Sequence, residues 1–441
     1  MLFSSWVSAV HRFWRPPSST VDKNIRLLYL EIFWSAILGG VVTFNDAFVI
    51  RLGAPNALVG LLASAPPLIV ALLTIPAARL LERHADRRPY MFWGLLLNRI
   101  GYLVVALLPL FAPHQTAAWV VAGFVVLNLP VTLFNAGWMP LLADVVPEQR
   151  RAYVFSRRNI IYFAVTAAVT FVAGRWLSAS AFPTNYQTLY AFGAAAALIS
   201  CATLERLVVP PCDVPKREAP VRHRHVWFPA VSWDAMRNEF RNHRPFWNLT
   251  LNSLVFNFGI WMSVPLFTLF FVRELNADDG WIGLKNGLNS LAVVGGFLLA
   301  ERLIRWRGFR WVLTVLGPLS PLYPFSVALL ADLDLILFAV MFVSFVNPSL
   351  DLSRSNLLLK LSPRERRASY VGFWTTIMNA GAVIAPLISV ALADRIGLRA
   401  GLIVAGGVRL AGALLFFVLK LDEPPAEEPA LLEGAAEKTG A

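Results

Sequence analysis

The chain has 441 residues, of which 57% are hydrophobic and 15% charged, and its formal net charge is +12. The core of a soluble protein does not bury so large a share of apolar sequence, so the composition excludes an ordinary soluble protein and predicts a membrane protein. The positive charge does not indicate a nucleic-acid partner, because Lys and Arg stand in short clusters between long apolar runs. Cys201 and Cys212 give neither a disulfide framework nor a metal site.

Residues 1–24 predict an amphipathic helix that lies on the membrane surface, with Phe3, Trp6 and Phe13 on one face. Twelve later segments reach the length of about 20 apolar residues that a membrane-spanning helix needs. They are residues 26–50, 56–81, 89–111, 116–141, 155–177, 185–207, 246–272, 280–303, 309–331, 334–358, 370–393 and 399–421. The runs are too long for barrel strands and do not alternate, so we expect an all-α membrane protein.

Most Lys and Arg residues outside these spans fall on one side, which includes both chain ends and residues 208–245. The positive-inside rule therefore predicts that both termini are cytoplasmic, in the inner or plasma membrane of the cell. We expect a six-helix bundle over residues 25–207, a basic cytoplasmic linker over 208–245 and a second six-helix bundle over 246–421. Residues 422–441 are acidic and rich in small residues, and we expect them to be disordered.

Three short patterns recur about half a chain apart. Residues 141–154 and 357–370 share a Pro followed by twin arginines, Arg150 and Arg151 in the first and Arg366 and Arg367 in the second. A second pattern, around residue 82, and a third, which begins at residue 52, also recur in the second half of the chain. The three patterns follow the same order in both halves. Collinear repeats indicate two related halves joined by the linker.

Six spans, a basic linker and six more spans resemble the major facilitator superfamily of secondary transporters. The family has a signature loop between the second and third spans of each half. Residues 296–310, with Glu301, Arg302 and Gly308, are similar to that loop, and residues 76–90 keep Glu82 and Arg83. The resemblance implies two pseudo-symmetric six-helix bundles and alternating access around a cavity lined mainly by the first and fourth spans of each half.

The loop charges are candidates for a conformational latch, because an acid at a helix end can accept charge-assisted hydrogen bonds from arginines nearby. The alternative is that these charges only set the topology and meet phosphate head groups. The latch candidates are Glu82, Arg83, Glu301, Arg302, Arg150, Arg151, Arg366 and Arg367.

Polar groups inside the spans are the candidate functional residues, because an ionisable group in hydrocarbon costs at least about 2.5–3.5 kcal/mol. The candidates for substrate or proton binding are Glu31, Asp46, Asn45, Asn128, Asn135, Asn252, Asn257, Asp351 and Arg354. For the carboxylates of the first span, the alternative is that they lie at solvated helix ends. For the pair Asp351 and Arg354 the alternative is a gate, and for the asparagines it is packing between helices. Arg99, Lys285 and Arg409 are candidates for salt bridges inside the membrane, and Asp278, Asp279 or Asp46 are possible partners for Lys285.

No catalytic constellation, metal cluster or phosphate-binding loop stands out, so we expect neither an enzyme nor a cofactor nor ATP-driven transport. We expect a monomeric secondary transporter that contacts membrane lipids, a small organic substrate and protons. Aromatic residues in the spans, among them Phe44, Trp138, Trp261 and Trp374, favour export of an amphipathic compound. Uptake of a polar nutrient, or a lipid-handling or sensor protein on the same scaffold, remains open.

Overall fold

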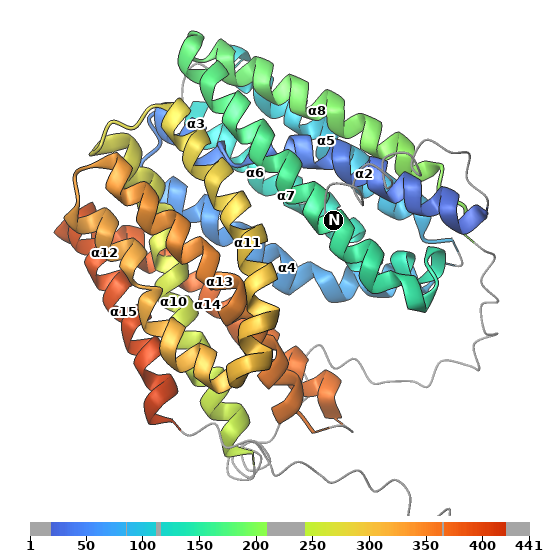
Figure 1. The fold of residues 1–441 in the computed structure, drawn as a ribbon. Helices are drawn as coiled ribbons and strands as arrows, with labels where there is room; N and C mark the ends of the chain where they lie inside the picture. The colour runs from blue at the N-terminus through green and yellow to red at the C-terminus, as the bar shows by residue number, and fades with distance from the viewer. Residues whose placement is uncertain (1–18, 85, 112–115, 210–242, 364–365, 420–441) are drawn as a thin grey trace, which may run out of the picture.

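The computed structural model describes residues 19–84, 86–111, 116–209, 243–363 and 366–419. The surface helix expected in residues 1–24, most of the linker and the carboxyl-terminal tail lie outside the described residues. Within them every regular element is a helix (Figure 1), which confirms the all-α prediction.

The first bundle contains α2 to α8. These are α2 (Thr20–Val42), α3 (Asn45–Arg51), α4 (Asn56–Glu82), α5 (Arg88–Phe111), α6 (Thr116–Val145), α7 (Glu148–Ala179) and α8 (Thr184–Glu205). The second bundle contains α10 (Arg244–Arg273), α11 (Asp279–Trp311), a π-helical turn (Val312–Leu316), a 3-10 turn (Gly317–Leu319), α12 (Leu322–Leu329), α13 (Leu333–Leu361), α14 (Arg367–Ile396) and α15 (Leu398–Val418).

Eleven helical stretches among the described residues are long and apolar enough to cross a membrane, and the stretch Asp279–Leu329 has 51 residues. A straight helix of that length would measure about 75 Å, more than twice the hydrocarbon thickness of about 30 Å. The chain instead turns back at Gly308, whose φ of 80° suits glycine. The stretch therefore supplies two crossings, as the sequence predicts. The first crossing is divided at Thr43 into α2 and α3.

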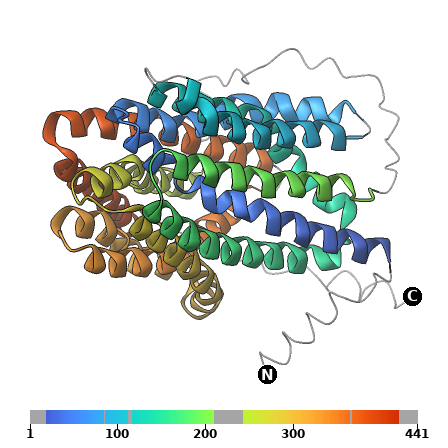
Figure 2. The same cartoon turned by 90° about the horizontal axis from the view of Figure 1, so that it is seen from above.

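The two bundles lie side by side and meet through two pairs of helices, α7 with α11 and α4 with α14 (Figures 1 and 2). These pairs join the fifth span of one half to the second span of the other, as a pseudo-twofold arrangement requires. The bundles converge at the end that contains Arg51 and Asp279, which we call the closed end. They diverge towards the end that contains Thr20 and Arg244, which we call the open end (Figure 1).

Glycines allow the two bundles to approach closely. A Cβ atom added at Gly283 of α11 would lie 2.5 Å from the Thr170 carbonyl oxygen of α7, and one at Gly60 of α4 would lie 2.6 Å from Val390 of α14. Larger side chains at these positions would therefore push the helices apart.

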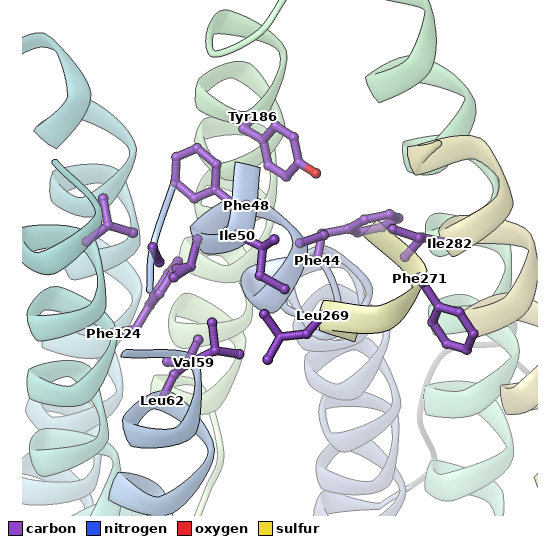
Figure 3. Close-up of a cluster of buried hydrophobic side chains, with 14 of the residues drawn as sticks. Phe44, Phe48, Ile50, Val59, Leu62, Phe124, Tyr186, Leu269, Phe271 and Ile282 are labelled. Carbon is purple, nitrogen blue, oxygen red and sulfur yellow. The ribbon is translucent and has the colours of Figure 1, made fainter. Parts of the chain in front are cut away.

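An apolar cluster shared by both bundles seals the closed end. Phe44 at the break in the first span and Phe48 of α3 belong to one buried cluster with Leu269 and Phe271 of α10 and Ile282 of α11 (Figure 3). All five side chains are buried. The hydrophobic effect thus favours contact between the bundles at this end.

Candidate functional site

Polar contacts across the bundle boundary reinforce the apolar cluster, and we call them the closed-end lattice. Arg51 Nε donates to Asp279 Oδ1 at 2.9 Å and Arg51 Nη2 donates to the Ala277 carbonyl at 3.1 Å. The Tyr186 hydroxyl donates to the same Asp279 oxygen at 2.7 Å. Because the Asp279 side chain is 7% exposed, these bonds form in a partly dry environment.

A second part of the closed-end lattice joins α4 and α14 to the end of α10. Arg273 Nη1 donates to Asn56 Oδ1 at 2.6 Å, and Asn56 Nδ2 donates to Asp394 Oδ1 at 2.6 Å. Arg273 also donates to the Ala54 carbonyl. One asparagine therefore connects an arginine at the end of the seventh span to an acid at the end of the eleventh.

A third part of the lattice joins α7 to the beginning of α11, where the Ser178 hydroxyl donates to Asp278 Oδ2 at 2.8 Å. Partial burial opposes ionisation of Asp278, but the hydrogen bonds from the Trp281 backbone N–H and from Ser178 outweigh it and hold the pKa of Asp278 below its usual value. The ionised form therefore caps α11 and contacts the other bundle.

Asp46 and Lys285 lie beside the closed end and belong to different bundles. They interact electrostatically. The Lys285 Nζ atom also lies 5.5 Å from the centre of the Phe271 ring. Asn286 Nδ2 reaches the Thr43 carbonyl at 3.4 Å, which places α11 against the break in the first span. Asp278 and Asp279, the other partners considered for Lys285, are engaged in the closed-end lattice.

In the first bundle Glu31 is held by an arginine that sequence reasoning missed. Arg158 Nη2 lies 2.9 Å from Glu31 Oε2, and the two side chains are 7% and 3% exposed. Arg158 also donates to the Leu28 carbonyl at 3.0 Å and lies 4.0 Å from the centre of a Trp138 ring. The signal was present, because Arg158 falls inside the apolar segment 155–177. The ion pair ties α2, α6 and α7 together.

In the second bundle the structure brings Asp351, Arg354 and Asn257 together. Arg354 forms an ion pair with Asp351 and donates from Nη1 to Asn257 Oδ1 at 2.8 Å. The Arg354 side chain is 7% exposed, whereas that of Asp351 is 65% exposed. Arg354 is thus buried and neutralised by a carboxylate that remains accessible.

The accessible side of Asp351 does not face lipid. The outer face of α13 carries the exposed residues Leu335, Phe338 and Phe342. At 3.6 residues per turn, Asp351 lies about 180° around the helix from that face. Its carboxylate therefore points into the protein, towards the boundary between the bundles.

The remaining asparagine candidates divide between local packing and accessible positions. Asn45 Oδ1 accepts from the Tyr190 hydroxyl at 2.8 Å, and Asn128 Nδ2 donates to the Phe124 carbonyl of its own helix at 2.8 Å. Asn135 is exposed. Asn252 is fully buried, and neither polar atom of its side chain has a hydrogen-bond partner among the described residues.

The expected salt bridges of Arg99 and Arg409 need correction. Arg99 Nη2 donates to the Ser35 hydroxyl at 2.8 Å, and Arg409 Nη2 to Asn347 Oδ1 at 3.2 Å. Neither arginine forms an ion pair with an acid in the described parts of the chain, because the carboxylates of the spans are bound to other cations.

The latch candidates lie on the surface near the open end. Glu301 pairs at 3.4 Å with Arg305 of the same helix, and both side chains are 70% exposed. Arg150 contacts Asp22 at 2.9 Å, which links the beginnings of α7 and α2, while Arg151 caps α6 through the Val146 and Ala143 carbonyls. The other candidates are exposed, namely Glu82, Arg83, Arg302, Arg366 and Arg367.

A cavity of 350 Å³ lies between helices of the two bundles. Its lining comes from α4, α10 and α14 and consists of Ala63, Pro67, Trp261, Val264, Met378, Asn379, Ala382 and Pro386. Trp261 and Asn379 give this mostly apolar space an aromatic face and an amide.

Two six-helix bundles that meet at one end, with charged side chains buried between spans, define a multi-pass membrane transporter rather than an enzyme. The sequence agrees, because the profile of the Major Facilitator Superfamily matches residues 32–352 and 322–439. The chain belongs to the Major Facilitator Superfamily. Its fold supports secondary transport by alternating access. No curated protein sequence matches the chain.

Solved transporters share the fold at low sequence identity. A bacterial homologue of the human lysosomal transporter Spinster, inward-facing and unoccupied, is 14% identical with a TM-score of 0.66, over 93% of this chain and 100% of the other. The nucleoside transporter NupG is 12% identical with a TM-score of 0.69, over 90% and 99%. The xylose transporter XylE from E. coli, in an inward-open conformation, is 14% identical with a TM-score of 0.63, over 92% and 97%.

Proposed function

We propose that this protein carries a small organic molecule across the cell membrane in exchange for protons, with the space between the bundles as its route. If both termini are cytoplasmic, as the distribution of Lys and Arg indicates, the open end faces the cytoplasm. The structure then represents the inward-facing state, and the reverse tilt must break the closed-end lattice.

The interaction between Asp46 and Lys285 carries the proposal of proton coupling, because the two residues belong to different bundles. Opening of the closed end moves α3 away from α11 and separates the carboxylate from its cation. An isolated carboxylate inside a membrane is strongly disfavoured and takes up a proton or another cation. Proton binding at Asp46 is thereby linked to the conformation of the transporter.

The cavity between α4, α10 and α14 supports an amphipathic substrate. Trp261 and Met378 supply apolar surface, and Asn379 can form hydrogen bonds. Most small-molecule sites combine an apolar lining with a few such polar groups. We propose export as the direction of transport. Uptake of a polar nutrient is the second candidate, favoured by the exposed polar side chains Asn135 and Asp351.

The proposal is tested with purified protein in proteoliposomes. A thermal-shift screen of metabolites and drugs first identifies compounds that bind, and flux of these compounds is then measured with and without a proton gradient. A pH-sensitive dye inside the liposomes reports proton movement. We expect Asp46→Asn to abolish proton-coupled flux while the melting temperature is retained.

Asp334→Asn is the matched control, because Asp334 is an exposed acid in the first turn of α13. It should transport as the unaltered protein does. Proton-coupled flux and pH dependence that survive in Asp46→Asn would refute the role of Asp46. Opposite directions of coupled flux distinguish export from uptake.

A further inference from the structure

Charged residues inside the predicted spans form a group between the open-end boundary and the middle of the membrane, which we call the mid-membrane belt. It consists of Glu31, Arg99 and Arg158 in the first bundle and Asp351, Arg354 and Arg409 in the second. Arg354 lies seven residues from the open-end terminus of its helix, and the other five lie nine to eleven residues from theirs. All six residues lie inside the predicted membrane spans, where an ionised group is costly.

The belt has more cations than anions. Each bundle supplies two arginines and one carboxylate, and each carboxylate pairs with one arginine, Glu31 with Arg158 and Asp351 with Arg354. Arg99 and Arg409 have the neutral partners already described. A buried cation without a counter-charge is costly, so the belt is best satisfied when an anion is added.

The cluster around Phe256 in the second bundle shows where that anion fits. The guanidinium carbons of Arg354 and Arg409 lie 4.9 Å and 5.4 Å from the centre of the same Phe256 ring. The two arginines interact electrostatically and repel each other, while Asp351, which is paired with Arg354, also attracts Arg409. Arg409 is 2% exposed, and its Nε atom has no hydrogen-bond partner among the described residues.

We propose that Arg354 and Arg409 together bind the anionic group, a carboxylate or a phosphate, of the transported compound. This inference rests on the proposed transport function and adds the chemical class of the substrate. Guanidinium groups bind both kinds of anion through paired N–H donors.

Asp351 is the internal counter-ion that the substrate replaces. Its carboxylate holds Arg354 in the empty protein, and because it is 65% exposed towards the bundle boundary, it can leave without burial of its charge. An anion that arrives from the open end then takes its place between the two arginines. Lipid head groups are poor candidates for this site, since Arg409 is buried and lies twelve residues inside the open-end boundary of its predicted span.

The inference is tested by thermal stability of the purified protein in a neutral detergent and a chloride-free buffer. The probes are succinate, inorganic phosphate, chloride and tetramethylammonium. We expect succinate or phosphate to raise the melting temperature in a dose-dependent way and tetramethylammonium to have no effect. Arg409→Gln should weaken the apparent affinity for the active anion at least about tenfold, the loss expected when a charge-assisted contact is removed.

Arg399→Gln is the matched control, because Arg399 lies on the same helix, is exposed and sits near the closed end. It should bind the anion as the unaltered protein does. The empty Arg409→Gln protein should melt at an equal or higher temperature than the unaltered protein, since the change removes a buried cation that Arg354 repels and that shares one carboxylate with it. A lower melting temperature together with unchanged anion affinity would show a merely structural role for Arg409 and overturn the inference.

Arg354→Lys provides a second variant that keeps the charge and loses the paired donors, and weaker anion binding is again expected. If chloride alone stabilises the protein, the site binds a resident ion. If anionic lipid added to the micelles stabilises it but soluble anions do not, the site binds a lipid. Either result would refute the inference. Because binding is read without a gradient, its outcome is independent of whether proton-driven flux is found.

Discussion

The closed-end lattice allows a quantitative prediction for Asp279→Asn. Asp279 accepts hydrogen bonds from Arg51 and Tyr186 across the bundle boundary. Asparagine keeps an acceptor oxygen but loses the charge, and charge-assisted bonds are roughly twice as strong as neutral ones. With about 1 kcal/mol for a neutral bond, the change removes about 1–2 kcal/mol from the state closed at this end. The ratio of closed to open molecules should then fall about five- to thirtyfold.

The populations are measured by double electron–electron resonance between spin labels on the two bundles. Labels attached at Ala179→Cys and Arg395→Cys, both at exposed positions of the closed end, report the separation in a background without Cys201 and Cys212. Asp279→Asn should increase the fraction of long distances. Asp86→Asn breaks an exposed ion pair with Arg88 inside the first bundle and should leave the distances unchanged. A distance distribution in Asp279→Asn identical to that of the parent would refute the reasoning.

Four further predictions concern other parts of the molecule. Glu31→Gln leaves Arg158 buried without its carboxylate, so the protein should lose about 3–5 kcal/mol of stability. Thermal denaturation should show this loss, and adding Arg158→Leu should restore stability. Equal stability of the single and double variants would contradict the prediction. Gly283→Ala places a methyl group against α7 and should lengthen the distances between the closed-end spin labels; unchanged distances would show that the helices accommodate the methyl group. Hydrogen bonds lower the pKa of Asp278 in the folded protein. The stability that its ionised form gives to the closed end is therefore present above the unfolded pKa of about 3.9 and is lost as the pH falls through the folded pKa. Acidification should open the closed end, and Asp278→Ala should weaken this response. Asp351→Asn leaves Arg354 buried without its carboxylate, so it should impair coupled flux in proteoliposomes and lower the melting temperature; flux with the parent's pH dependence would remove Asp351 from the mechanism.

The spans and their helical nature could be predicted from the sequence because length and apolarity are local properties of the chain. Only the structure shows how two of the crossings are divided. The break at Thr43 between α2 and α3 lies inside an apolar segment without a proline, and its conformation depends on packing against α10 and α11.

By itself, the sequence determined a doubled membrane protein of apolar helices and the short set of charged residues inside them, since these follow from composition and repeat spacing. The tertiary structure alone decided which of these charges meet. Glu31 pairs with Arg158, Asp46 interacts with Lys285 of the other bundle, and Arg409 donates to Asn347 instead of forming an ion pair with an acid among the described residues. Such partners are brought together by the rotation of each helix about its axis and by the tilt between bundles, and neither quantity is encoded in any local stretch of residues.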